Sequence, residues 1–72
     1  MSKKSKREEK IRNNPNNVSL NDFEWLINQY GRINEGGNHP LAIIDNRVFP
    51  YKRKNSVSSV YVKKVLEIID HL

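Results

Sequence analysis

The stretch RINEGGNHPLAIIDNRVFPY, residues 32–51, decides the fold, because short apolar segments alternate in it with turn-forming residues. Arg32 to Glu35, Pro40 to Ile44 and Arg47 to Tyr51 each have a length typical of a β-strand. Asp45-Asn46 predicts a two-residue turn between the last two segments, since both residue types tolerate positive φ. The stretch therefore predicts a three-stranded antiparallel meander.

An amphipathic helix is predicted before the meander, over about Leu20 to Tyr30. Its apolar residues recur on one face at helical spacing and are expected to form core: Leu20, Phe23, Leu26, Ile27 and Tyr30. Ser19 is placed to cap the start of this helix, and Gly31 to end it in a left-handed conformation. Trp25 falls on the opposite face.

A second amphipathic helix is predicted after a polar loop over Lys52 to Ser59, with Ser58 or Ser59 as its cap. Its apolar residues again repeat at helical spacing: Val62, Val65, Leu66, Ile69 and Leu72. Residues 18–72 thus predict an α+β domain of order αβββα, with both helices on one face of the antiparallel sheet. That layout is like the fold of double-stranded-RNA-binding domains.

Residues 1–17 are expected to form a basic N-terminal arm and an Asn/Pro linker. Ser5 to Arg12 can form a short charged helix, which Pro15 ends because it disfavours a helical conformation at the residue before it. Met1 to Arg7 is basic like the start of a signal peptide. Glu8-Glu9-Lys10 follows where an apolar segment would be required, so secretion is not expected.

Composition restricts the functional classes. The chain has 72 residues and no cysteine, which excludes a disulfide framework and a thiolate zinc site. No apolar run approaches the length of a membrane span. We therefore expect a cytoplasmic protein without a metal or cofactor.

The net charge of +5 is unevenly distributed. Residues 1–12 hold six Lys/Arg against two Glu, residues 13–46 hold one against four acidic residues, and residues 47–72 hold six against two. Two basic blocks around an acidic middle predict a polyanion partner that contacts the arm, the third strand and the last helix. For residues 1–7, a solubility role is the alternative.

Several motifs together resemble one known family over most of the chain. Residues 13–72 are similar to the HicA toxins of bacterial toxin–antitoxin pairs. The resemblance rests on the order and spacing of five pieces: Asn-Asn-Pro-x-Asn-Val at 13–18, Tyr30-Gly31, Glu35-Gly36-Gly37-Asn38-His39, Arg47-Val48-Phe49-Pro50, and Tyr61-Val62-Lys63-Lys64-Val65-Leu66-Glu67-Ile68-Ile69-Asp70.

The resemblance implies an endoribonuclease that halts growth by degrading mRNA, and a HicB-like antitoxin that neutralises it by covering the active site. The functional histidine of the family, in a Gly-x-His motif, corresponds to His39. Three departures stand out. Many HicA toxins have a second histidine directly after the first, and Pro40 stands there in this chain. A Lys or Arg often precedes the glycine of the motif, whereas here the pair is Glu35-Gly36. A histidine frequent in the basic stretch after the third strand is missing from Tyr51 to Lys54.

RNA cleavage can also be argued from the residues alone. RNA carries its own nucleophile, the 2′-hydroxyl, so a neutral imidazole at His39 can remove that proton without a metal. Flexible glycine backbone and cations nearby would bind the phosphate. The candidate RNA-binding residues are Gly37, Asn38, Lys52, Arg53 and Lys54. Tyr51 could stack on a base, although packing is the expected role of both Tyr51 and Tyr61.

Three functional classes remain open at the level of sequence. The prediction is a metal-independent endoribonuclease with His39 as general acid/base. The alternatives are a non-catalytic RNA-binding module of the same fold and an interaction protein whose basic face docks on an acidic partner. A lone histidine is commonly a surface or capping residue, and Gly36-Gly37 can simply form a bulge.

Trp25 is the candidate contact for the antitoxin. Tryptophan is enriched among the residues that dominate binding energy at interfaces, and an acidic helix is a poor surface for RNA. The alternative is that Trp25 packs under Ile11 or Val18 from the preceding segment.

Overall fold

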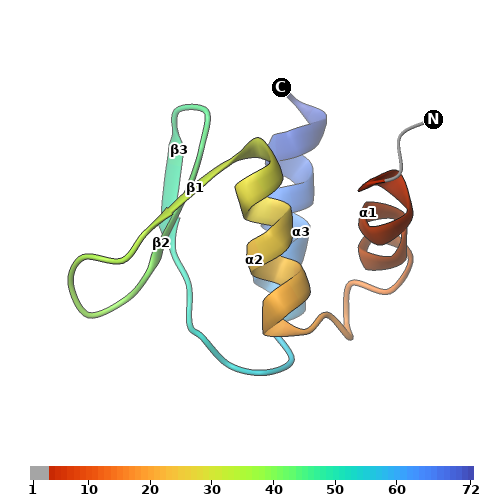
Figure 1. Cartoon of the computed structure of the whole chain (residues 1–72), viewed down its shortest axis with the longest axis horizontal. Helices are drawn as coiled ribbons and strands as arrows, with labels where there is room; N and C mark the ends of the chain where they lie inside the picture. Colours follow the sequence, from red (N-terminus) through yellow and green to blue (C-terminus); the bar gives the residue numbers. More distant parts are fainter. Residues whose placement is uncertain (1–3) are drawn as a thin grey trace.

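The computed structural model describes residues 4–72. Within this range the elements are α1 (Lys4–Asn13), α2 (Leu20–Tyr30), β1 (Gly31–Asn34), β2 (Leu41–Ile44), β3 (Arg47–Pro50) and α3 (Ser59–Asp70). The strands form one antiparallel sheet in the order β1-β2-β3 (Figure 1). The predicted α+β class and the order helix, meander, helix are confirmed.

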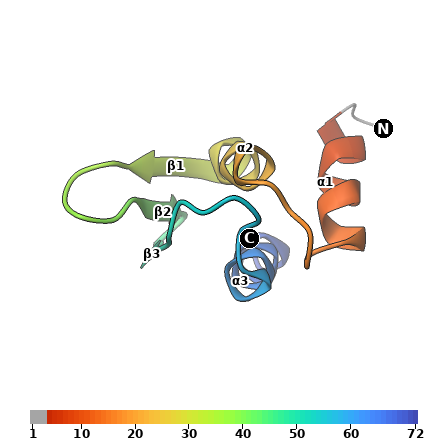
Figure 2. The ribbon, with the colours of Figure 1, turned by 90° about the horizontal axis from the view of Figure 1, so that it is seen from below.

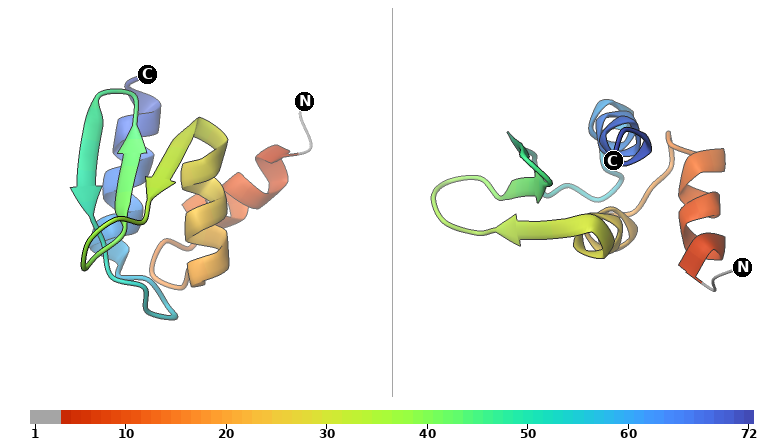
Figure 3. Two further views of the ribbon diagram at one scale, coloured as in Figure 1. Left: turned by 60° about the vertical axis from the view of Figure 1, so that its left-hand side comes forward. Right: turned by 90° about the horizontal axis from the view of Figure 1, so that it is seen from above.

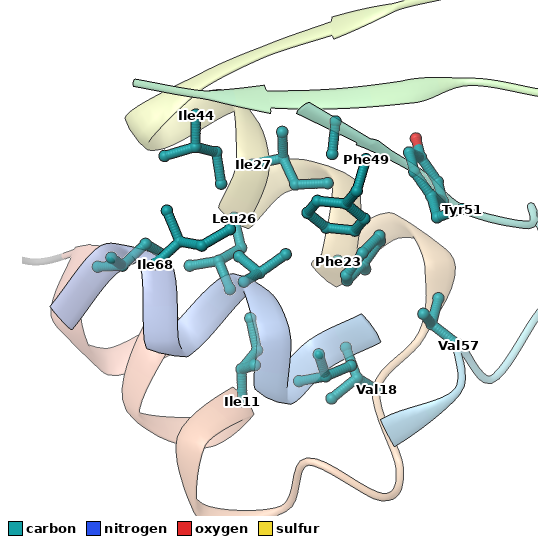
Figure 4. Close-up of a cluster of buried hydrophobic side chains, with 14 residues drawn as sticks. Ile11, Val18, Phe23, Leu26, Ile27, Ile44, Phe49, Tyr51, Val57 and Ile68 are labelled. Atoms are coloured by element: carbon teal, nitrogen blue, oxygen red, sulfur yellow. The ribbon is translucent and has the colours of Figure 1, made fainter. Parts of the chain in front are cut away.

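The elements form three layers. Helices α2 and α3 occupy the middle, the sheet lies on one side of them, and α1 lies on the other (Figure 2). Figure 4 shows the apolar core, which runs from α1 to the sheet. Its buried residues come from every element except β1: Ile11, Val18, Phe23, Leu26, Ile27, Ala42, Ile44, Phe49, Tyr51, Val57, Val62, Val65, Ile68 and Ile69.

The predicted core of α3 needs one correction. Leu72 is 62% exposed instead of buried, because α3 ends at Asp70 and the last residue lies beyond the helix. Ile68 is buried, although the sequence pattern did not single it out. On α2 the prediction is closer, since Phe23 is buried at the centre of the face and Leu20 packs against the core from its edge.

Helix α1 packs on the rest of the molecule through one apolar side chain and several polar contacts. Ile11 is 2% exposed and belongs to the core. Arg12 donates two hydrogen bonds to the Asp70 carboxylate on α3, with distances of 2.9 and 3.2 Å. Tyr30 of α2 donates a hydrogen bond of 2.6 Å to Glu8. The short charged helix expected here is therefore docked against both other helices.

Ser19 caps α2 as predicted, accepting a hydrogen bond of 3.1 Å from the Asp22 N–H. The prediction for Gly31 is wrong. Its φ of −163° is extended, and β1 begins there without any left-handed residue. Glycine is required for space instead, because a Cβ atom at this position would lie 1.9 Å from the Ile43 carbonyl oxygen.

The pairing of β2 with β3 sets the position of the chain beyond Pro50. Ile44 pairs with Arg47 across the turn, and Asp45 has the positive φ, 57°, that was expected for it. Beyond the last paired residues, the Tyr51 N–H donates a hydrogen bond of 3.2 Å to the Pro40 carbonyl. The end of β3 is thereby held against the loop that carries His39.

Candidate active site

His39 lies in the exposed loop between β1 and β2, residues 35–40. The loop turns locally, because the Asn34 side-chain oxygen accepts a hydrogen bond of 3.0 Å from the Gly36 N–H and Gly37 adopts a φ of 87°. This loop and the segment after β3 lie at the same end of the molecule (Figure 3, left). The fold therefore brings together two segments that the sequence analysis linked to RNA.

A small open pocket joins these two segments. His39 lines it together with Pro50, Tyr51, Lys52 and Tyr61, and its volume is about 140 Å³. The hydrogen bond between Tyr51 and Pro40 keeps the imidazole loop beside Lys52. An exposed imidazole, a cation and apolar walls thus share one site.

Arg53 does not share the position of Lys52. Its Nε donates a hydrogen bond of 2.7 Å to Glu24 on α2, and its Nη1 donates one of 2.7 Å to Glu35 at the base of the His39 loop. The hydrogen bond and the charge of Arg53 lower the pKa of the Glu35 carboxyl. Two carboxylates therefore engage this guanidinium, which ties the loop to α2.

Tyr51 is a packing residue. It is 1% exposed, and its ring meets that of Phe23 edge to face at 5.0 Å. Its hydroxyl donates a hydrogen bond of 2.5 Å to Glu24. Burial, followed by this hydrogen bond, raises the pKa of the Tyr51 hydroxyl. A ring held in this way has no free face for a base.

Tyr61 was expected from the sequence to be a packing residue only. It is half-buried at the edge of the core, and its ring lies nearly parallel to that of Phe49, at 16° and a centroid distance of 6.4 Å. The same side chain lines the pocket with His39. Its position beside Val62, at the edge of the apolar face of α3, was the available signal.

The remaining candidates lie around or away from the pocket. Gly37, Asn38 and Lys54 are exposed and do not line it. Within residues 6–72, neither Lys52 nor Lys54 forms an ion pair with a carboxylate. His71 lines a different pocket, where its Nδ1 lies 2.8 Å from the Glu67 carbonyl oxygen. His39 is therefore the histidine of this site.

Trp25 of α2 contacts Arg7 of α1, and α1 lies on the opposite side of the molecule from the loop between β1 and β2 (Figure 1). It is half-buried and packs against the core. The Arg7 guanidinium carbon lies 4.7 Å from the centre of its ring, and Arg7 also pairs with Asp22 at 2.9 Å. The ring is thus partly covered, and its antitoxin contact stays a prediction.

Residues 4–72 contain no group of three or more His, Cys, Asp or Glu side chains arranged to hold a metal ion. None of the described helices is long and apolar enough to cross a membrane.

Compared with family models, curated proteins and solved structures, the chain matches none of them. Function must therefore be inferred from the site itself.

Proposed function

We propose that this chain is a HicA-type toxin, a metal-independent endoribonuclease that cleaves mRNA and is neutralised by a HicB-like antitoxin. The observation that carries the proposal is the pocket in which His39 lies with Lys52 and Tyr61. The order of α2, the meander and α3 supports it, because double-stranded-RNA-binding domains have the same order of helix, three strands and helix.

His39 acts as the general acid/base of this proposal. Its neutral imidazole takes the proton of the 2′-hydroxyl, the 2′-oxygen forms a bond to phosphorus, and the bond from phosphorus to the 5′-oxygen breaks. The imidazolium returns the proton to the departing 5′-oxygen. A positioned acid/base group of this kind contributes about 10²–10⁴-fold in rate. Slow turnover is enough for a toxin, since a single cut inactivates a message.

Lys52 supports this step electrostatically. It lines the same pocket as His39 and makes no ion pair among the described residues, so its ammonium group can interact with the phosphate. Negative charge grows on the phosphate oxygens in the transition state, and a cation already in place stabilises it. The antitoxin would neutralise the toxin by covering this pocket, and Trp25 is the candidate for an additional contact.

The decisive experiment incubates purified protein with single-stranded RNA in EDTA. We expect the wild type to cleave and His39→Ala to lose cleavage and growth inhibition. Circular dichroism and Tm should remain nearly unchanged, because the His39 side chain is exposed. His71→Ala is the matched control, since it removes the other histidine, which lines a different pocket.

A non-catalytic RNA-binding module is the second candidate function. It is favoured by the pocket's lack of a carboxylate or of another histidine besides His39. RNA binding without cleavage by the wild type would establish this alternative. Cleavage that requires Mg²⁺, or that persists in folded His39→Ala protein, would contradict the acid/base scheme.

A further inference from the structure

One side of α3 packs along β3, beginning at the His39 pocket with Tyr61 and leading to a second pocket that contains Lys64. Tyr61 and Lys64 both lie on this side, where they cover Phe49 of β3, which is 6% exposed. The Lys64 ammonium lies 5.3 Å from the centre of the Phe49 ring. Lys64 also lines a second pocket, together with Arg47 at the start of β3. We call the surface formed by Lys52, Tyr61, Lys64 and Arg47 the β3–α3 seam.

We infer that the β3–α3 seam is the binding track for single-stranded RNA that leaves the His39 pocket, with Tyr61 as the platform on which a base stacks. Lys64 and Arg47 would then contact phosphates. The inference rests on the proposed function for the identity of the partner. It adds residues that lie outside the loop and outside the catalytic step.

The combination of side chains favours single-stranded nucleic acid. Sites for single strands combine a positively charged groove with aromatic rings on which bases stack. The seam has a half-exposed tyrosine between Lys52 at one end and Lys64 at the other. From Arg47 to Lys52 the chain is largely extended, and five residues of strand span roughly 16 Å. The track is therefore longer than one nucleotide.

The seam also has a defined end. The pocket that contains Arg47 and Lys64 is lined by Asp45 and Glu67 as well. Phosphates on Arg47 and Lys64 would lie beside these carboxylates, which repel any phosphate further along, so the strand would leave the protein near Lys64. An acidic peptide could also satisfy the cations, but only its aromatic residues could stack on Tyr61, whereas every nucleotide carries a base.

The stacking role can be tested in a protein that cannot cut its ligand. In the His39→Ala background, we would titrate a single-stranded oligoribonucleotide that carries one 2-aminopurine, whose fluorescence changes when it stacks. We expect Tyr61→Leu to abolish that change and to raise the Kd at least fivefold, since stacking on an aromatic side chain dominates such sites. Tyr61→Phe keeps the ring and should retain both properties.

The phosphate contacts have a matched control on the same helix. Lys64→Met should reduce the salt dependence of RNA binding, lowering the slope of log Kd against log salt by roughly 0.7. Methionine keeps apolar cover over Phe49. Lys63→Met makes the same change one residue away, on the side of α3 that carries Asp70 and faces α1, and should leave the slope unchanged.

The outcomes separate this inference from the proposed function. Fluorescence and affinity that stay unchanged in folded Tyr61→Leu protein would overturn the seam even if the wild type cleaves RNA. Equal effects of Lys64→Met and Lys63→Met would do the same. Competition by poly-glutamate as strong as that by RNA would assign the surface to an acidic protein instead. If the seam variants bind RNA as expected but the wild type never cleaves it, the β3–α3 seam would stand and the catalytic proposal would be overturned.

Discussion

Arg53 makes contacts in the folded protein that its neighbours in the sequence do not indicate. It stands in the basic run from Lys52 to Lys54, which predicts a phosphate contact. Folding places it beside Glu24 and Glu35, which are 29 and 18 residues away. The guanidinium therefore connects α2 with the base of the His39 loop. We regard it as a positioning residue for the loop, and Lys52 as the cation of the pocket.

Gly31 has no room for a side chain. Gly31→Ala should destabilise the fold by about 3 kcal/mol, at the upper end of overpacking costs, because the new methyl group would collide with the Ile43 carbonyl of β2. Gly36→Ala is the control, since the nearest atom to its Cβ would be the Asn34 side-chain oxygen at 3.4 Å. Urea denaturation compares the two variants. Equal stabilities would contradict the assigned role of Gly31.

The loop after β3 carries two exposed lysines, Lys52 and Lys54, that we expect to contact RNA. Replacing Lys52 and Lys54 together with Gln should weaken RNA binding and reduce its salt slope by roughly 0.7 for each lost phosphate contact. Lys6 and Lys10, exposed on α1, provide the same charge change as a control. The measurement is fluorescence anisotropy at several salt concentrations. A larger effect of the α1 pair would move the RNA footprint to the N-terminal helix.

Helix α1 contributes Ile11 to the apolar core. Ile11→Ala should lower the free energy of unfolding by about 2–4 kcal/mol, because it deletes a side chain that is 2% exposed in the core. Lys10→Ala changes the exposed neighbour and should have little effect. Urea denaturation measures both. If Ile11→Ala is as stable as Lys10→Ala, α1 does not contribute to the core.

The charge pairs make the stability of the whole molecule depend on pH. The hydrogen bond from Arg12 lowers the pKa of Asp70, and that from Arg53 lowers the pKa of Glu35. In each case the unfolded state binds the proton more readily, so the stabilisation is present above the ordinary carboxyl pKa and is lost as pH falls further.

We therefore expect Tm to fall as the pH is lowered below about 4. Asp70→Asn should flatten this dependence, because the variant cannot lose the Arg12 pair on protonation. Asp45→Asn is the control, since Asp45 forms no ion pair among the described residues. Scanning calorimetry at several pH values measures the slopes. Identical slopes for both variants would exclude a contribution from the Arg12–Asp70 pair.

Local patterns in the sequence were enough to predict most of the architecture. Helical spacing located α2, and the turn residues located the meander, each strand within a residue or two of its observed ends. These signals are local, because a helix or a hairpin is specified by residues close together in the chain. His39 became the catalytic candidate from an imidazole two residues after Gly37 and from the resemblance to HicA toxins, and its role stays a prediction.

Only the tertiary structure decided which residues share the site. Tyr61 joins His39 because α3 packs along β3. Tyr51 lines the same pocket, but its ring cannot stack on a base, because it is buried and its hydroxyl reaches Glu24 on α2. The requirement for glycine at position 31 likewise comes from the backbone of β2, which leaves no room there for a side chain. In each case the partner lies far away in the chain, and a local pattern contains no information about contacts that form only when the elements pack together.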